Sequence, residues 1–331
     1  MTIRATTRRR VLLPAGAVAV LAAAALAGSQ LLLQNGASAA TSTLVGYATQ
    51  GGGTTGGAGG STVTVTTAAA LTTAGKSSST EIIKVSGIIS LSGQIDITSN
   101  KSVIGVGSNS GLTGGGLRVK NSSNVIIQNL KISKAVGTDA ITVQTSTRVW
   151  IDHNDLSSDM SHDKDYYDGL LDITHASDYV TVSWNKLHDH WKVSLVGHSD
   201  SNASEDTGHL RVTYHHNYFL NFNSRAPSLR FGTGHVYNNY FVNADTAVHS
   251  RENAQMLVQN NVFSGVTTPI ETTGDSDVDG YVNQSGNTFG SGTNDITQTG
   301  TFTKPPYTFT LDATSTVAST VTAGAGTGKV G

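Results

Sequence analysis

The sequence predicts an all-β solenoid, in which the chain winds into stacked coils, and three observations support this fold class. A template recurs six times: an apolar residue, a short β-prone run, Asn five positions after the start, and an apolar residue two positions later. Successive copies start 24, 31, 32, 22 and 22 residues apart, which is typical of repeats that stack on their neighbours. The chain has 37 Gly and only 13% charged residues, which favours β-structure with many turns. The copies start at Val125, Val149, Val180, Val212, Gly234 and Met256.

The Asn of the template is predicted to be structural. Each unit should contribute short parallel strands, with neighbouring coils about 4.8 Å apart. Asn at the same turn of successive coils can satisfy backbone groups and the amide of the next Asn together. The residues at this position are Leu130, which replaces Asn in the first copy, and then Asn154, Asn185, Asn217, Asn239 and Asn261.

The other elements follow in chain order. A Gly/Thr-rich coil over 41–61 is expected to pack near one end of the solenoid, and the alternating pattern of 61–67 predicts a strand. Residues 81–90 and 94–107 read as the first full coils. Inserts at 157–169 and 198–209 lengthen two units and are expected to project from one face, where binding occurs. The polar, Gly-rich tail from 305 onward should lie along the outside.

Residues 1–39 are predicted to be a signal peptide. Arg8, Arg9 and Arg10 precede an apolar stretch, and Ala37-Ser38-Ala39 supplies small residues in the arrangement that precedes cleavage. A membrane anchor is the weaker interpretation, since nothing later is long and apolar enough to span a bilayer. We therefore expect a secreted, extracellular protein with one domain over 40–331 and no membrane contact after cleavage. General and twin-arginine export both remain open.

Charge and cysteine content narrow the function classes. The chain has 21 Lys and Arg against 23 Asp and Glu, and four of the basic residues lie in the predicted signal peptide, so the mature chain is acidic. Nucleic-acid binders normally carry the opposite sign, which argues against that class. There is no Cys, but a mature chain of roughly 290 residues can bury a continuous core without disulfides.

Six charged side chains are predicted to share one face of about four successive coils. Carboxylates converging there would favour a hard cation such as Ca²⁺, which accepts irregular oxygen ligands, although unrelated surface aspartates are the alternative. The cations could be a solvated row, or a strip that binds a polymer with a carboxylate on each unit. The carboxylates are Asp139, Asp168 and Asp172, and the cations are Lys192, Arg225 and Arg230.

Several runs carry a family resemblance. VWIDHNDLS, DYYDGLLDIT, WNKLHDHWKVSLVG, RAPSLRFG and the tail PYTFTLD closely resemble the pectate lyases of polysaccharide lyase family one, over almost the whole mature chain. The resemblance implies a right-handed parallel β-helix. It also implies a calcium-dependent enzyme that cleaves α-1,4-polygalacturonate by β-elimination and leaves 4,5-unsaturated oligogalacturonides.

The resemblance also assigns roles to residues. It makes Asp139, Asp168 and Asp172 the calcium ligands, Arg225 the base, and Lys192 and Arg230 the groups that bind substrate carboxylate. Two departures matter. Gly137 stands where some members have a further acidic ligand. Trp191 stands at a variable position, where it could stack on a sugar or simply pack.

The chemistry is consistent with these roles. Removing the C5 proton of a galacturonate places negative charge on its carboxylate, which nearby cations would stabilise. Because guanidinium is ordinarily protonated, crowding of Arg225 by other cations is needed to favour its neutral form, and we expect an alkaline pH optimum. Water is expected to protonate the leaving group. A polygalacturonase, with Asp168 and Asp172 as its acid pair, a pectin lyase and a non-catalytic β-helix remain the alternatives. We expect a monomer.

Overall fold

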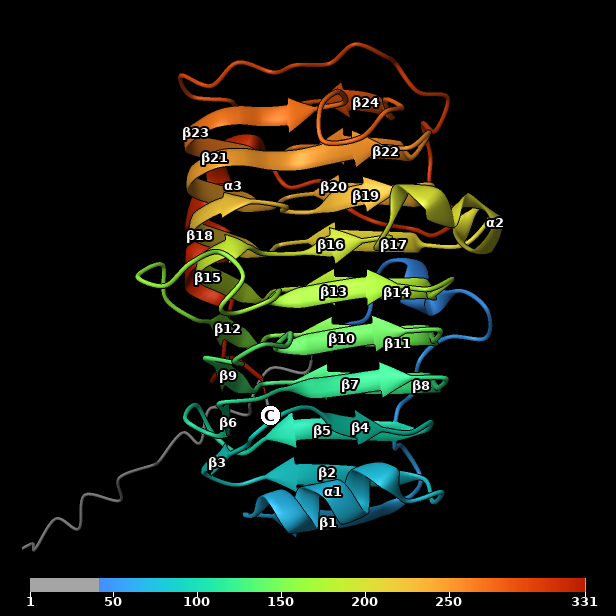
Figure 1. The fold of residues 1–331 in the computed structure, drawn as a ribbon, viewed down its shortest axis with the longest axis vertical. Coiled ribbons are helices and arrows are strands. Elements are labelled where there is room, and N and C mark those ends of the chain that lie inside the picture. The colour runs from blue at the N-terminus through green and yellow to red at the C-terminus, as the bar shows by residue number, and fades with distance from the viewer. Residues whose placement is uncertain (1–41, 331) are drawn as a thin grey trace, which may run out of the picture. The chain divides into compact units, whose positions relative to one another are not determined.

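The repeat forms the coils of a parallel β-helix, as predicted (Figure 1). The computed structural model describes residues 42–330, so the predicted signal peptide lies outside the described residues. The coils from β2 to β19 each contribute one strand to each of three faces. The first face, sheet I, has ten strands in the order β1-β2-β5-β8-β11-β14-β17-β20-β22-β24. Its strands are β1 (Ser61–Val65), β2 (Glu81–Val85), β5 (Lys101–Gly105), β8 (Ser123–Gln128), β11 (Thr147–Asp152), β14 (Asp178–Ser183), β17 (Arg211–His215), β20 (Thr233–Tyr237), β22 (Gln255–Gln259) and β24 (Tyr281–Ser285).

The other two faces form one 14-stranded sheet, because the long strand β21 belongs to both. Face II contains β3 (Ile88–Ser90), β6 (Gly111–Thr113), β9 (Lys131–Ser133), β12 (Asp155–Ser157), β15 (Lys186–Lys192) and β18 (Tyr218–Ser224). Face III contains β4 (Ile95–Ile97), β7 (Leu117–Lys120), β10 (Ile141–Gln144), β13 (Leu171–Thr174), β16 (Leu195–Val196) and β19 (Ser228–Arg230). The shared strands are β21 (Tyr240–Arg251) and β23 (Val262–Glu271), which pair with each other.

The strand register agrees with the phase that the repeat assigned. Val149 pairs with Val125 on one side and with Val180 on the other. Val212 then follows Val180, and the same column continues through Gly234 and Met256. The valines of this column are fully buried, so equal positions in successive units stack along one hydrophobic core.

The Asn residues of the template form a hydrogen-bonded ladder inside the coils. The side-chain amide of Asn154 donates to Asn185 Oδ1 at 2.9 Å, and that of Asn185 donates to Asn217 Oδ1 at 3.1 Å. Each backbone N–H at these positions also donates to the next Asn Oδ1, at 2.9 and 3.0 Å. The ladder runs through Asn239 and Asn261 and continues to Asn287. Its structural role is therefore clear, because these buried amides satisfy one another and the backbone.

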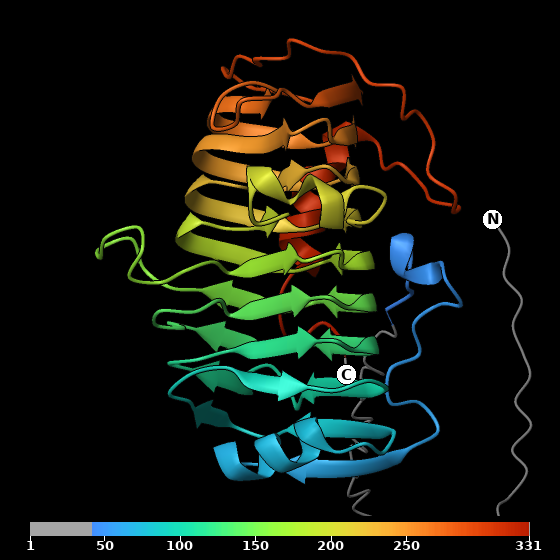
Figure 2. The same cartoon turned by 45° about the vertical axis from the view of Figure 1, so that its right-hand side comes forward.

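The N-terminal arm lies only in part where it was predicted: the Gly57 N–H donates to Ser102 Oγ at 2.9 Å near the N-terminal end of sheet I, but the arm begins further along. It was expected near one end of the solenoid, but its 3-10 turn η1 (Tyr47–Thr49) packs against the middle of sheet I. The backbone N–H groups of Tyr47 and Ala48 donate to Thr213 Oγ1 and Thr181 Oγ1, both at 3.0 Å. Two threonines on adjacent strands, both buried beneath the arm, thus anchor it. Figure 2 shows the blue arm running along this side of the molecule.

Two helices were not predicted. Helix α1 (Ala68–Lys76) lies at the N-terminal end of the solenoid, and α3 (Thr314–Gly324) lies in the tail. The tail does run along the outside, as expected, and the backbone N–H of Gly328 donates to Asn129 Oδ1 at 2.7 Å. Among residues 42–330, no helix is long and apolar enough to cross a membrane.

The two inserts leave the solenoid at different corners, which corrects the expectation of a single face. Insert 157–169 connects face II to face III between β12 and β13. Insert 198–209 connects face III to sheet I between β16 and β17, and contains η2 (Asp200–Asn202) and α2 (Ala203–Asp206). Both inserts still reach one region. Asp200 of the second insert pairs with Arg230 at the end of β19, and Lys164 of the first insert lines the same hollow as Arg230.

Candidate active site

The predicted site residues gather at the corner where face II passes into face III. Asp139 precedes β10, and Asp172 lies in β13 one coil further on. Thr142 and Asp172 are register partners, so Asp139 lies three residues from the column that contains Asp172. Lys192 ends β15, and Arg225 lies between β18 and β19. Successive coils therefore present these side chains side by side, as the repeat phase required.

Two of the three aspartates face one point beside Gly169. Asp139 Oδ1 accepts a hydrogen bond from the backbone N–H of Gly169 at 2.8 Å, and its Oδ2 accepts one from Thr142 Oγ1 at 2.6 Å. Asp172 Oδ1 accepts from the backbone N–H of Leu195 at 2.9 Å. A Cβ on Gly169 would lie 2.6 Å from Asp172 Oδ1 and 2.9 Å from Asp139 Oδ1. The absence of a side chain on Gly169 leaves the space that both carboxylates face.

Burial and mutual repulsion raise the pKa values of this pair and favour the protonated carboxyl groups. Burial raises the pKa of Asp139, and the nearby charge of Asp168 adds to the increase. The pKa of Asp172 is raised well above its ordinary value, chiefly by burial and then by Asp139. Two buried carboxylates that face each other favour a shared proton or a bound cation.

Asp168 is close enough to act on this pair electrostatically but is much more exposed. Its side chain is 60% exposed, and Oδ1 lies 3.4 Å from Lys192 Nζ, which also contacts Asp165 Oδ1 at 2.7 Å. His190 Nε2 contacts the Asp168 carbonyl oxygen at 3.1 Å and so anchors the end of the insert. Among residues 42–330, no group of three or more His, Cys, Asp or Glu is positioned to hold a metal ion. The three-aspartate ligand set therefore stays a prediction.

A strongly cationic hollow of about 440 Å³, the basic cleft, lies beside the carboxylate pair. Five of its lining residues are Lys or Arg and one is an acid. The lining consists of Lys164, Trp191, Lys192, Asn223, Ser224, Arg225, Arg230, Arg251 and Asp275. All three predicted cations are present, and Lys164 and Arg251 are additions. Arg251 could have been found by extending the repeat, because it is the register partner of Arg230 one coil later. Lys164 lies in an insert, where the repeat assigns no position.

Arg225 is held by its backbone while its side chain is left unpaired. Its φ of 63° lies in the left-handed region, which is unusual for a residue with a side chain. Its carbonyl accepts from Ser194 N–H at 2.6 Å, and Ala226 N–H donates to Ala247 O at 2.8 Å, so the neighbouring coils fix this conformation. Within the described residues, no carboxylate lies within salt-bridge distance of the Arg225 guanidinium. Such a rigid, unpaired group is free to meet a ligand.

Arg230 is held differently, because its charge is already partnered. Its Nε pairs with Asp200, and one terminal nitrogen donates to Gly197 O at 2.8 Å. Arg251 approaches the same Asp200 carboxylate at 3.6 Å. Burial lowers the pKa of Arg251, and the neighbouring charge of Arg230 lowers it further. Asp200 therefore binds two cations that would otherwise repel each other at the rim of the cleft.

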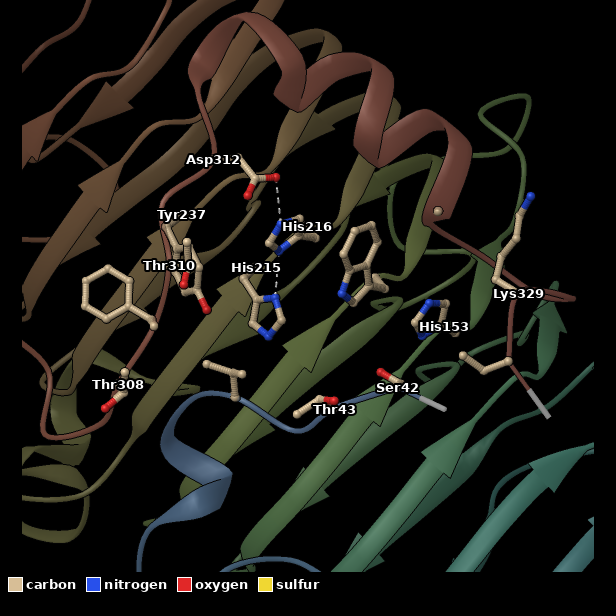
Figure 3. A pocket seen from close by; sticks show the side chains of 15 residues that line it. Ser42, Thr43, His153, His215, His216, Tyr237, Thr308, Thr310, Asp312 and Lys329 are labelled. Atoms are coloured by element: carbon tan, nitrogen blue, oxygen red, sulfur yellow. Dashed lines mark hydrogen bonds and ion pairs between the residues drawn. The ribbon is translucent and has the colours of Figure 1, made fainter. Parts of the chain in front are cut away.

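A larger hollow, the sheet I pocket, has a different character (Figure 3). It measures about 600 Å³ and lies on sheet I between the N-terminal arm and the C-terminal tail. Trp184 stacks on His216 there, with ring centroids 4.2 Å apart, and His216 Nε2 contacts Asp312 Oδ2 at 3.2 Å. None of the six predicted site residues lines it. Its greater volume is therefore no guide to where the chemistry occurs.

Comparisons with known proteins agree with the fold and the cleft. A family model described as pectate lyase matches residues 18–330. The probable pectate lyase A of Aspergillus fumigatus is 50% identical over 253 residues, which cover 76% of this chain and 77% of that protein. Pectate lyase A of Aspergillus niger is 49% identical over 249 residues, covering 74% and 76%. A pectate lyase from Bacillus sp. N165, solved in complex with trigalacturonate, superimposes with a TM-score of 0.79 at 37% identity, covering 86% of this chain and 99% of that one.

The β-helix, its cationic corner and these matches define an enzyme of the polysaccharide lyase class. The chain belongs to the pectate lyase family. The family resemblance found in the sequence is thus confirmed, as is the parallel β-helix that it implied.

Proposed function

We propose that this pectate lyase is a secreted, calcium-dependent enzyme that cleaves α-1,4-polygalacturonate by β-elimination. The observation that carries the proposal is Arg225, which lines the basic cleft and has no carboxylate partner among residues 42–330, while the Asp139–Asp172 pair lies nearby. A polymer with one carboxylate on each sugar matches a cleft with five cations. The trigalacturonate bound to the Bacillus relative supports the same substrate class.

The carboxylate pair suits a calcium ion. Asp139 and Asp172 supply oxygen ligands, and the glycine between them leaves the space beside both carboxylates open. Asp168 completes the predicted ligand set from the rim of the same corner. Calcium, when bound, would supply positive charge that attracts a substrate carboxylate and stabilises developing negative charge. Gly137, which replaces an acid of some relatives, has a φ of 64°, a conformation that favours glycine.

The residues of the chain would divide the reaction between them. Lys192 and Arg230 bind substrate carboxylates and orient the sugar. Arg225, as the neutral guanidine, removes the C5 proton, and the electron pair left on C5 is stabilised by the adjacent carboxylate. That pair then forms the C4–C5 double bond as the C4–O4 bond breaks, and the leaving oxygen takes a proton from water. Arg225 finally returns its proton to solvent.

A hydrolase is the second function that the residues permit. In glycoside hydrolases, two acids about 5–10 Å apart activate water and protonate the leaving oxygen. The acid pair of that alternative, Asp168 and Asp172, argues against it, since Asp168 is 60% exposed and contacts Lys192 while Asp172 Oδ1 accepts a hydrogen bond from the backbone N–H of Leu195. A pectin lyase that acts on esterified polymer would have little use for a cleft with five cations. A pectate lyase therefore fits the site better than a hydrolase or a pectin lyase.

One assay tests the proposal. Purified mature protein is incubated with polygalacturonate, in calcium and in excess chelator, while ultraviolet absorbance and new reducing ends are both followed. The proposal expects the two signals to rise together in calcium and neither to rise in chelator. Reducing ends without absorbance would identify a hydrolase, and activity that survives the chelator would overturn the calcium requirement.

A further inference from the structure

The aromatic ring in the basic cleft belongs to Trp191. This residue precedes Lys192 in β15 and lies in a wall otherwise made of charged and polar residues. A half-buried tryptophan among cations has no obvious packing purpose. Within the described residues, no aromatic ring stacks on Trp191 and no cation lies over its face.

The polar edge of Trp191 is already satisfied. Its indole N–H donates to the carbonyl of His162 at 2.9 Å, and His162 lies in the insert 157–169. The ring of His162 stacks on Tyr166 at 4.1 Å, which keeps this part of the insert ordered. The hydrogen bond fixes the orientation of the indole and leaves its apolar surface as the group that can still bind something.

The other two tryptophans show what a structural role looks like in this chain. Trp150 is buried and its indole donates to Ser183 Oγ at 2.9 Å. Trp184 is stacked between His153 and His216, with ring centroids 5.7 and 4.2 Å away. Both rings are used by the fold. Trp191 differs from them because its indole N–H is hydrogen-bonded to His162 while, within the described residues, its ring stacks on no aromatic side chain. It also lies in the hollow where the substrate is proposed to bind.

We propose that Trp191 is a substrate-binding residue whose indole ring packs against the C–H face of a galacturonate ring. The sugar is amphipathic, because its carboxylate and hydroxyl groups project from the ring edge while the axial C–H groups give one face an apolar character. Lys192, the next residue in the strand, would bind a carboxylate while Trp191 covers the ring. This inference rests on the proposed polygalacturonate substrate and adds a contact that charge cannot supply.

Two substitutions separate ring contact from a merely structural role. Trp191→Phe keeps an aromatic ring but loses the hydrogen bond to His162, and Trp191→Leu loses both. If the ring binds sugar, KM for polygalacturonate should rise about ten-fold in Trp191→Leu and clearly less in Trp191→Phe, with kcat within about two-fold of wild type. If the tie to His162 is what matters, both variants should change equally, and that result would overturn the proposal.

Fluorescence tests the contact without turnover. Trigalacturonate added to the wild-type protein should change tryptophan emission, and the change should vanish in Trp191→Phe but persist in the matched control Trp184→Phe. A change that survives in Trp191→Phe, or is missing from wild type at saturating ligand, would refute the contact. Because binding is read directly, an enzyme that binds trigalacturonate but fails to cleave polygalacturonate would count against the proposed function and not against Trp191. Thermal melting of each variant confirms that it is folded.

Discussion

The basic cleft and the sheet I pocket are two hollows on one solenoid that use stacked positions for different ends. In the sheet I pocket, residues from successive coils stack on one another, as Trp184 does on His216, and a tail covers them. In the basic cleft, successive coils place like charges side by side, and within the described residues the Arg225 guanidinium has no carboxylate within salt-bridge distance. Stacking like with like costs free energy when the groups are charged. An anionic ligand would therefore relieve repulsion among the cations of the cleft, whereas the sheet I pocket is built mainly from stacked rings.

The sharpest test of this difference is Arg225→Ala. Removing the proposed base should lower kcat by roughly 10²–10⁴-fold, which is the usual contribution of a general base. Trigalacturonate should still bind, because the other cations remain. The control is Lys329→Ala in the sheet I pocket, which should leave kcat and KM unchanged. Unaltered turnover in Arg225→Ala would remove this residue as the base.

The second test removes one of the two facing carboxylates. Asp172→Asn should abolish the response of activity to calcium, since a neutral amide is a weaker ligand. In chelator the same variant should melt at a higher temperature than wild type near neutral pH, because the charge of Asp172 is disfavoured by burial.

The pH dependence of that stability follows from the raised pKa of Asp172. A carboxyl whose folded pKa lies above its ordinary value of 3.8 favours folding at low pH, and this contribution is lost as pH rises through the folded pKa. Melting temperature in chelator should therefore fall more steeply toward neutral pH in wild type than in Asp172→Asn. Equal slopes would show that Asp172 is not the group responsible.

The third test concerns the cations that surround Arg225. Arg251→Ala should raise KM for polygalacturonate several-fold, roughly 1 kcal/mol of lost charge attraction from the buried wall of the cleft. It should also weaken the dependence of KM on salt, because fewer charges remain to be screened. Measuring KM from low to high ionic strength checks both effects. An unchanged salt dependence would exclude Arg251 from substrate binding.

The smallest effect on catalysis is expected in the sheet I pocket. Trp184→Ala should destabilise the fold by about 2 kcal/mol, through lost stacking and a cavity beneath the end of α3. KM and kcat measured well below the melting temperature should match wild type. A changed KM would mean that the two hollows communicate, and the contrast between them would then fail.

Coil register was predictable because it follows from a two-residue alternation and a repeated Asn. Val125 and Val149 were aligned by sequence alone, and the structure pairs them in that register. The same phase brought Lys192, Arg225 and Arg230 into one cleft. Whether these residues have the catalytic and binding roles given to them stays a prediction.

The features that escaped prediction lie where the repeat gives no information. Helices α1 and α3 are rich in Thr and Ala and carry little amphipathic pattern, so their helical form depends on packing against the end and the outside of the solenoid. The contact of Lys192 with Asp165 depends on how insert 157–169 folds back, which no periodicity encodes. The strand pattern likewise does not predict that threonine side chains on sheet I anchor the N-terminal arm.

Strand β21 has a consequence for how this architecture could change. It runs unbroken for 12 residues from face II into face III, and β23 follows it for 10, so no loop interrupts these two coils at that corner. Grafting extra coils beyond β23 would lengthen the apolar interior and leave the basic cleft as short as before. A longer cleft would require new coils on the N-terminal side of Asp139, where a loop separates the face II strand from the face III strand.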